Sequence, residues 1–303
     1  MSYQALDYRT AGPTATISLN GPDDVNTIVP PMLDELADAV DRATRDDAVK
    51  VIVLQGIGSS FCAGFNFSGG FHQWDDRLTA DGRWDAGRDI IMVTSDTLGW
   101  VPRFMSLWRT PKPVIAKVHG WCLGGGSELA LCADIVVASG DARIGTPYSR
   151  LWGCHHAGMW VHRLGLAKAK EYALFGRPLS GTEAVEAGLI NKAVPFDRLH
   201  DEVDEMARQL ASIPASQLAV MKLVVNQAYE NMGLRSTQLL GSVMDGAMRN
   251  TAEALDFIEV AQEQGVPAAV RHRDAPFGDY SQAPPEHKPD RRHVITLDDG
   301  ARS

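Results

Sequence analysis

Two glycine-bearing segments contain the residues best suited to chemistry. They are SSFCAGFNF (Ser59–Phe67) and HGWCLGGGSELALCAD (His119–Asp134). In both, glycine and small residues allow backbone N–H groups to point into an open site. The second segment adds a single carboxylate, Glu128, just after three consecutive glycines. This pattern predicts an oxyanion pocket made of backbone amides with one acid/base group beside it.

The glycine run lies between a predicted strand and a predicted helix, but it fits none of the common glycine motifs. It is not the dinucleotide pattern G-x-G-x-x-G, and no lysine follows it as in a phosphate-binding loop. Leu129 stands where a nucleophile elbow requires glycine, so Ser127 is not expected to be a nucleophile. Glu128 has two interpretations. A carboxylate in a first helical turn complements the helix dipole, whereas apolar neighbours favour its neutral form and suit a proton shuttle.

Elements that would position these segments follow from the hydrophobic pattern. A helix is predicted to begin at Pro30, because proline is favoured in a first helical turn. Alternation of strands and helices predicts an α/β fold with a mainly parallel sheet. The predicted strands are Thr14–Leu19, Lys50–Gln55, Val114–Val118 and Ile135–Ala138.

Residues 68–100 differ from this pattern. They are rich in Gly, Asp and Trp and lack a clean period until about Ile90, so they form either a lid over the site or a surface excursion. After about residue 196 only helical stripes follow, around Val203, Leu218, Leu240 and Leu255. Their apolar faces are expected to pack on the α/β body or on a partner subunit.

From Arg271 the chain is polar and contains several prolines, which predicts an extended or partly disordered tail. We therefore divide the chain into an α/β core of residues 1–196, a helical region of residues 197–267 and a polar tail of residues 268–303.

Composition excludes several classes of protein. The net charge of −9 and the lack of a basic run argue against nucleic-acid binding. No apolar stretch is long enough to span a bilayer, and the N-terminus lacks a signal-peptide pattern. The four cysteines form no C-x-x-C pair, which predicts buried thiols in a reducing cytoplasm rather than a zinc site or disulfides. No metal or redox cofactor is expected.

Three motifs in order, FCAGFNF, GWCLGGGSELALCADIVVAS and RIGTPYSRLWG, closely resemble the crotonase superfamily, which is the enoyl-CoA hydratase/isomerase family. The resemblance runs from about residue 5 to 265. It implies an α/β fold of the crotonase type, a spiral of ββα units with a C-terminal helical trimerisation region. It also implies a homotrimer, or a hexamer made of two trimers.

The resemblance assigns roles to individual residues. The backbone N–H groups of Phe65 and Gly125 would hold the thioester oxygen of an acyl-CoA substrate, so coenzyme A would enter only as part of the substrate. Glu128 matches the first of two glutamates used by hydratases, and Tyr148 stands where the second would be. Seven further positions match acyl-CoA contacts: Val25, Ala63, Asn66, Phe67, Leu123, Gly124 and Pro147.

Tyr148 leaves the reaction open. The leading expectation is hydration of a 2-enoyl-CoA to a 3-hydroxyacyl-CoA with Glu128 as the acid/base. A phenol with a pKa near 10 is a weak acid, so isomerisation, decarboxylation, or C–C or thioester hydrolysis are alternatives. Tyr148 either donates a proton or only lines the pocket, and His155 or His156 is another source of the second group. A non-catalytic acyl-CoA binder is the alternative of another class.

Overall fold

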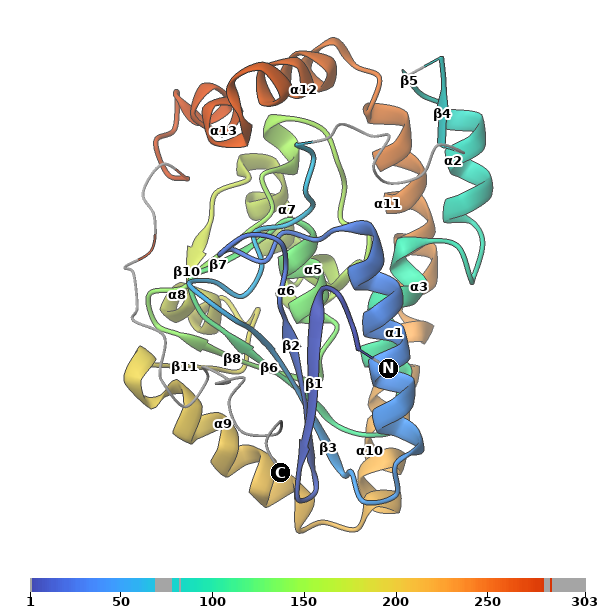
Figure 1. The fold of residues 1–303 in the computed structure, drawn as a ribbon, viewed down its shortest axis with the longest axis vertical. Coiled ribbons are helices and arrows are strands. Elements are labelled where there is room, and N and C mark those ends of the chain that lie inside the picture. The colour runs from blue at the N-terminus through green and yellow to red at the C-terminus, as the bar shows by residue number, and fades with distance from the viewer. Residues whose placement is uncertain (1, 69–77, 82, 281–283, 285–303) are drawn as a thin grey trace, which may run out of the picture.

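The computed structural model describes residues 2–68, 78–81, 83–280 and 284. Its centre is a six-stranded sheet in the order β1-β2-β3-β6-β8-β11 (Figure 1). β1 pairs with β2 in an antiparallel hairpin, and the other neighbours are parallel. The strands are β1 Leu6–Ala11, β2 Thr14–Leu19, β3 Val51–Gly56, β6 Val114–Val118, β8 Ile135–Ser139 and β11 Lys192–Val194.

Two smaller sheets accompany the large one. A three-stranded sheet has the order β10-β9-β7, with β7 Trp121–Leu123, β9 Arg143–Gly145 and β10 Leu179–Ser180. β4 Thr79–Ala80 and β5 Arg83–Trp84 form an antiparallel pair. The large and three-stranded sheets are joined directly by the chain, because β6 is followed at once by β7 and β8 by β9. This places the glycine segment after β7 at the junction of the two sheets.

Short helices connect the strands and surround the junction. They are α1 Pro30–Arg45, α2 Ala86–Val93, α3 Trp100–Phe104, α4 Ser106–Arg109, α5 Gly125–Leu131, the 3₁₀ turn η3 Tyr148–Arg150, α6 Met159–Leu164, α7 Leu166–Phe175 and α8 Gly181–Glu186. The C-terminal part is helical: α9 Phe196–Ala211, α10 Ala215–Asn231, α11 Leu234–Met248, α12 Ala252–Gln264 and α13 Val266–Asp274.

The large sheet is covered on both faces, as its continuous apolar strands predict. In β3, Ile52 and Leu54 belong to the main core, which includes α1 and α3. Val51 and Val53 face the opposite way and pack with the apolar stripe of α9. Burial of this apolar area stabilises the sheet by roughly 25 cal/mol per Å². The core thus fixes the strand ends from which the glycine segments begin.

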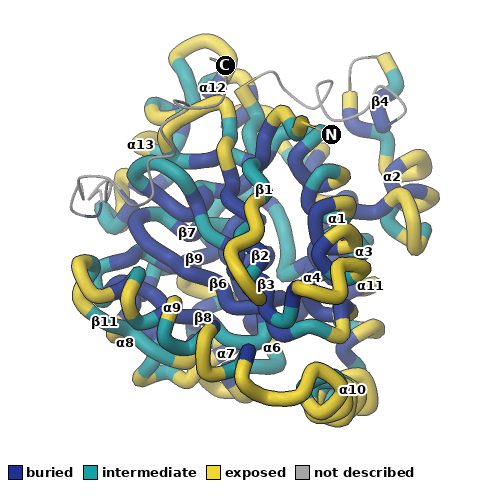
Figure 2. Tube along the Cα trace, turned by 60° about the horizontal axis from the view of Figure 1, so that its bottom comes forward, coloured by how far each residue is buried: buried dark blue, intermediate teal, exposed yellow. Residues whose placement is uncertain are grey.

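α11 has an unusual burial pattern. Apart from Leu234, its buried positions are polar or small, including Gln238, Ser242 and Asp245, whereas Leu240 and Met244 are 62% and 45% exposed. α10 also exposes large apolar side chains and contains no buried residue (Figure 2). Soluble monomers rarely expose contiguous apolar patches, so the exposed apolar side chains of these two helices are unusual.

The predicted α/β class, the four strands, the helix from Pro30 and the four C-terminal helices are confirmed. The predicted extended tail from Arg271 is wrong at its start. α13 continues through Asp274, and Tyr280, which is 5% exposed, packs on the body. Part of the predicted insert, residues 69–77 and 82, lies outside the described residues; the rest contains β4, β5 and α2. Within the described ranges, no helix has the length and apolar character of a bilayer span.

Candidate active site

The two glycine-bearing segments lie side by side. The amide of Cys62 donates to the carbonyl of Trp121 at 3.0 Å, and the amide of Leu123 donates to the carbonyl of Cys62 at 2.9 Å. Cys62 and Cys122 form a parallel bridge between the segments. Backbone hydrogen bonds therefore fix two segments that are distant in the sequence at one edge of the fold.

Glycine is required where the segments touch. Gly64 has φ +97°, and a Cβ atom there would lie 2.9 Å from the carbonyl oxygen of Leu123 and 3.7 Å from the amide nitrogen of Gly125. Gly125 is the first residue of α5, so its N–H has no intrahelical acceptor by position. Ile28 bonds to the carbonyl of Gly64 and to the amide of Asn66, an arrangement that directs the Phe65 N–H away from Ile28. The expected pair of amides thus lies in adjacent turns.

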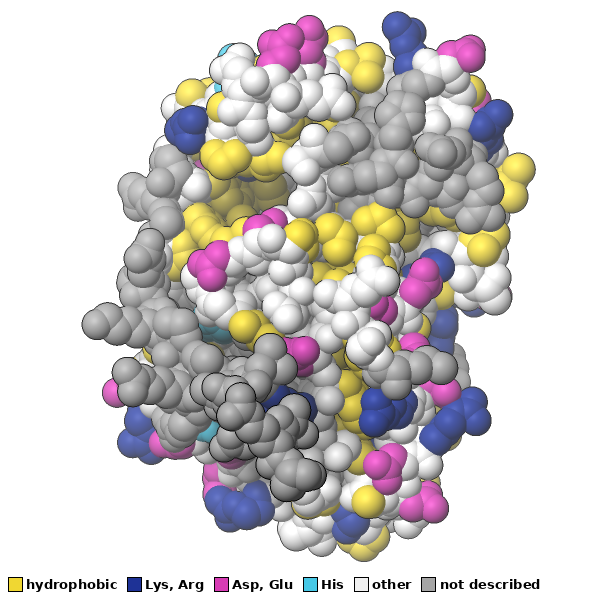
Figure 3. Space-filling model, viewed as in Figure 1, with side chains coloured by type: hydrophobic (Ala, Val, Ile, Leu, Met, Phe, Trp, Pro, Cys, Tyr) yellow, Lys and Arg dark blue, Asp and Glu magenta, His cyan; other side chains and the backbone are white. Residues whose placement is uncertain are grey.

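A cavity of about 340 Å³ opens beside these turns. Figure 3 shows a recess lined by hydrophobic side chains below α12 and α13. Most of the sequence-predicted residues line the cavity: Val25, Ala63, Phe65, Phe67, Leu123, Gly124, Gly125, Pro147, Tyr148 and His156. Asn66, Glu128 and His155 are not among its lining residues in the described part of the chain. The Asn66 amide instead donates to Thr27 at 3.1 Å and its oxygen accepts from Ser68.

Glu128 is fully buried in the first turn of α5. Its Oε1 accepts the amide N–H of His156 at 2.9 Å, and its Oε2 accepts that of Ala157 at 2.6 Å. Burial raises the pKa of Glu128 to about 7, although the charge of His156 and the two amide donors oppose this shift. Glu128 is therefore able to gain or lose a proton near neutral pH.

Two buried polar atoms beside Glu128 have no hydrogen-bond partner among the described residues. They are the Tyr148 hydroxyl and Nδ1 of His155. Burial and the nearby Glu128 charge raise the pKa of Tyr148 well above its ordinary value. Burial lowers the pKa of His155 to about 4, so its 3.8 Å approach to Glu128 is not an ion pair at neutral pH. Unpaired buried polar atoms are rare and mark a place where a polar ligand atom would be stabilised.

Sequence reasoning missed a charged group on the cavity wall. Nε2 of His156 lies 3.1 Å from Oδ1 of Asp245, and Asp245 also pairs with Arg249. All three residues line the cavity and are at most 4% exposed. The Arg249 guanidinium lies over the rings of Trp84 and Trp100, at 4.0 and 4.5 Å from their centroids. Asp245 and Arg249 are four residues apart in the sequence, a spacing that could have indicated an ion pair on one face of a helix.

The C-terminal segment also contributes to the cavity. Phe257 of α12, Val270 and Arg273 of α13, and Tyr280 line it. The Tyr280 hydroxyl donates to the carbonyl of Gly176 at 2.6 Å. Sequence analysis placed Arg273 and Tyr280 in a polar tail, because their partners come from distant parts of the chain.

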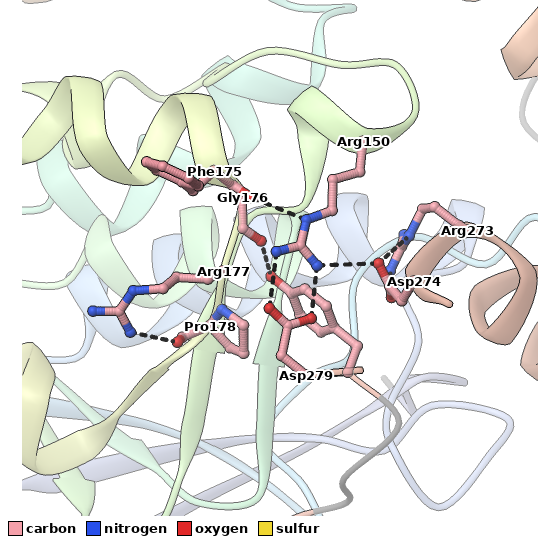
Figure 4. A network of polar contacts seen from close by, with 9 residues as sticks. Arg150, Phe175, Gly176, Arg177, Pro178, Arg273, Asp274 and Asp279 are labelled. Atoms are coloured by element: carbon pink, nitrogen blue, oxygen red, sulfur yellow. Dashed lines mark hydrogen bonds and ion pairs between the residues drawn. The ribbon is translucent and has the colours of Figure 1, made fainter. Parts of the chain in front are cut away.

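Arg150 joins this segment to the turn that bears Tyr148 (Figure 4). Its guanidinium donates to Oδ1 and Oδ2 of Asp279 at 2.6 and 2.8 Å, and to Asp274 at 3.2 Å. Its Nε donates to the carbonyl of Phe175 at 2.9 Å. The side chain of Arg150 is only 5% exposed, so these charge-assisted bonds replace its contacts with water.

No group of three or more His, Cys, Asp or Glu side chains suited to a metal ion occurs in residues 2–68, 78–81, 83–280 and 284. The four cysteines are free thiols, and burial raises the pKa of Cys62 to about 12.

Comparisons with known sequences point to one family. The sequence model of the enoyl-CoA hydratase/isomerase family matches residues 10–259. A probable enoyl-CoA hydratase of Rhizobium meliloti (strain 1021) is 31% identical over 289 residues, which cover 91% of this chain and 99% of the relative. The 1,2-epoxyphenylacetyl-CoA isomerase of Escherichia coli (strain K12) is 32% identical over 219 residues, 71% of this chain and 79% of the relative.

Solved structures share the fold. An enoyl-CoA hydratase from Mycobacterium smegmatis superposes with a TM-score of 0.84 at 36% identity, covering 92% of this chain and 96% of that one. An enoyl-CoA hydratase/isomerase from Xanthobacter autotrophicus Py2 gives 0.79 at 30% identity, covering 91% and 99%. The predicted crotonase-like α/β fold with C-terminal helices is confirmed.

Proposed function

The chain belongs to the enoyl-CoA hydratase/isomerase family, and on this basis we propose that it is an enzyme that hydrates a 2-enoyl-CoA to a 3-hydroxyacyl-CoA. The observation that carries the proposal is the buried Glu128, whose pKa is raised to about 7, directly behind the turns that bear Phe65 and Gly125. The fully apolar parts of the cavity wall suit an acyl chain.

In the proposed reaction the thioester oxygen lies between the N–H groups of Phe65 and Gly125. Addition at the β carbon moves negative charge onto this oxygen, and fixed amides stabilise it without reorganisation. Such a donor is worth roughly a hundredfold to a thousandfold in rate. The Glu128 carboxylate takes a proton from the attacking water, and the enolate then takes a proton at its α carbon. Coenzyme A enters and leaves as part of the substrate and product.

The unpaired Tyr148 hydroxyl and His155 Nδ1 support this placement of the water. A water held by Glu128 has donors and acceptors enough to satisfy both atoms. Tyr148 is then a hydrogen-bonding residue rather than an acid, since its pKa lies well above that of a free phenol.

The test follows the loss of absorbance of the conjugated thioester when short, medium and branched 2-enoyl-CoA substrates are supplied. Glu128→Gln is expected to lower the hydration rate by roughly a hundredfold to ten-thousandfold. Gln cannot accept both amide N–H groups, so it is expected to destabilise the fold by about 1–3 kcal/mol. Thermal unfolding and binding of a saturated acyl-CoA provide the controls. Unchanged turnover in a folded Glu128→Gln variant would remove Glu128 from the reaction.

A second candidate is a different enolate reaction, such as double-bond isomerisation, decarboxylation, or C–C or thioester hydrolysis. Tyr148 at the second acid position favours it, and so does similarity to a relative named as an isomerase. Parallel assays of isomer formation, carbon dioxide and free coenzyme A separate these reactions from hydration. Tight binding of acyl-CoA esters with no turnover in any assay would instead indicate a non-catalytic binder.

Self-association is part of the proposal. The α10–α11 surface, which we define by the exposed residues Val220, Met221, Leu223, Val224, Val225, Leu239, Leu240, Met244 and Met248, is apolar. Obligate interfaces are similarly hydrophobic. A homotrimer, alone or paired as a hexamer, would cover this surface.

A further inference from the structure

One corner of the cavity is charged, although the rest of its wall is largely apolar. His156, Asp245 and Arg249 meet there, and each side chain is almost completely buried. Removing charges from water costs several kcal/mol per ion even when they are paired. Perturbed titratable groups that line a cavity are therefore candidates for function.

The ring of His156 is held in one orientation. Its Nε2 lies 3.1 Å from Asp245 Oδ1, and Arg249 in turn fixes Asp245. The ring also lies against Trp100 and Tyr148, with centroids 6.1 and 6.2 Å away. Nδ1 of His156 makes no hydrogen bond within the described part of the chain. Since Asp245 accepts from Nε2, Nδ1 is the nitrogen available to a ligand.

We propose that His156, oriented by Asp245, is the residue that gives the enolate its proton at the α carbon. His156 is the catalytic residue in this step and Asp245 a positioning residue. The inference rests on the proposed enolate chemistry and names the acid that the reaction needs in addition to Glu128.

Other cavity-lining groups do not fit this role. The phenol of Tyr148 holds its proton too tightly, because burial and the Glu128 charge raise its pKa. Arg249 and His156 outweigh the effect of burial and lower the pKa of Asp245 to about 2, so it carries no proton to give. Burial lowers the pKa of His156, but Asp245 outweighs burial and raises that pKa above its ordinary value. The Asp245 carboxylate thus favours the protonated form of the His156 ring.

His156 and Glu128 are fixed relative to each other. The His156 amide donates to the Glu128 carboxylate, and Gln238 of α11 donates to the carbonyl of Ala157 at 3.0 Å. During hydration, a water O–H bond breaks as the C–O bond forms, and Glu128 takes that proton. The C=C electron pair passes into the enolate and then forms the α C–H bond with the Nδ1 proton of His156. Glu128 ends protonated and His156 neutral, and proton exchange with solvent restores both.

Several groups influence how His156 titrates. They face it from α5, η3, α11, α2 and its own loop: Glu128, Tyr148, Asp245, Arg249, Asp89 and His155. The apparent pKa values in a pH profile therefore belong to these coupled groups together. The shift of an apparent pKa when one of the groups is replaced is the informative measurement.

The test uses exchange of the α protons of butyryl-CoA with deuterium oxide, followed by NMR, beside the hydration assay. His156→Gln is expected to slow both by roughly a hundredfold or more. Glu128→Gln is expected to abolish hydration but to retain α-proton exchange. The matched controls are His200→Gln and Asp204→Asn, which alter a histidine–aspartate pair on α9 with 3.3 Å between Nε2 and Oδ2. These controls are expected to keep both rates.

Asp245→Asn distinguishes positioning from mere structural support. Without the carboxylate the pKa of His156 falls, so the alkaline limb of hydration, which needs the protonated ring, moves to lower pH. The rising limb of α-proton exchange, which needs the neutral ring, moves the same way. Equal loss at every pH, with neither limb moved, overturns the role of Asp245.

A measurement on the wild-type protein that does not depend on turnover is also needed, because a variant could lose activity through a folding defect. In wild-type protein, the ring resonances of His156 are expected to shift when butyryl-CoA binds, whereas those of His200 stay in place. An unshifted His156 ring, or α-proton exchange retained by folded His156→Gln, overturns the inference. If wild-type protein exchanges α protons through His156 but hydrates no enoyl-CoA, hydration fails as the function while the role of His156 stands.

Discussion

Arg150 and Asp279 form a two-pronged ion pair, with both guanidinium–carboxylate distances below 3 Å. The pair connects the turn that begins with Tyr148 to a C-terminal segment that contributes Arg273 and Tyr280 to the cavity. The aromatic ring of Phe277 also lies 3.9 Å from the Arg150 guanidinium. Arg150 therefore links the turn of Tyr148 to the C-terminal part of the cavity wall.

We expect Asp279→Asn to loosen this connection. Hydrogen bonds to charged groups contribute about 2 kcal/mol, so the free energy of unfolding should fall by roughly that amount. The C-terminal segment should also become more sensitive to limited proteolysis, and KM should rise more than kcat falls. Urea unfolding and proteolysis with mass spectrometry measure these changes. Asp41→Asn, which breaks the exposed Arg45–Asp41 pair, is the control and should change stability by less than about 0.5 kcal/mol. Equal effects of both variants would contradict the prediction.

The pKa of Glu128 predicts an acidic limb in the pH profile. As a base, Glu128 acts only when deprotonated, and its pKa is raised from 4.5 to about 7. Hydration measured as kcat/KM should therefore rise with pH through about 7, rather than near 4.5. Stopped-assay profiles from pH 5 to 9 on a stable substrate would reveal the limb, about two units on either side of the expected midpoint. A flat profile down to pH 5 would show that Glu128 is ionised throughout, contrary to its buried environment.

Gly125 is expected to tolerate no side chain. A Cβ atom there would lie 2.7 Å from Cδ2 of Phe65 and 3.1 Å from Cδ1 of Ile28. Gly125→Ala should displace the Phe65 ring, cost about 1–3 kcal/mol of stability and reduce turnover by disturbing the amide pair. Gly87→Ala on the exposed side of α2 is the matched control and should be neutral or slightly stabilising. Thermal unfolding and the hydration assay compare them; a fully active Gly125→Ala would separate this amide from catalysis.

The α10–α11 surface predicts assembly. Leu223 is 66% exposed, so Leu223→Glu should barely change the stability of one chain but should shift the protein to monomer mass. Light scattering coupled to size-exclusion chromatography measures the mass. Leu174→Glu, on α7 and 74% exposed, is the control. An unaltered oligomer in Leu223→Glu, or a wild-type protein that is already monomeric, would leave this surface without the proposed role.

Local patterns predicted much of the fold. Strands such as Val114–Val118 and helices such as Pro30–Arg45 were identified from apolar periodicity and proline placement, because these signals act over a few residues. The convergence of Ser59–Phe67 with His119–Asp134 followed from likeness to a family. Nothing in either segment alone specifies the hydrogen bonds that join Cys62 to Trp121.

The charged corner of the cavity was not predictable in the same way. Asp245 and Arg249 lie on the polar side of a helix, which a periodicity argument assigns to solvent. Their burial depends on Trp84, Trp100 and His156, which come from distant parts of the chain. Asn66, expected at an acyl-CoA contact, is not among the cavity-lining residues that the structure describes, and its side-chain amide donates to Thr27.

The two sides of α11 therefore have different surroundings. Its polar side packs on the loop of His156, where Gln238 donates to the carbonyl of Ala157, and its apolar side is exposed. In the proposed oligomer, dilution that separates the subunits would expose one side of the helix whose other side orients His156, so we expect activity to change before the protein unfolds. For this protein, specific activity should consequently be compared only at matched concentrations.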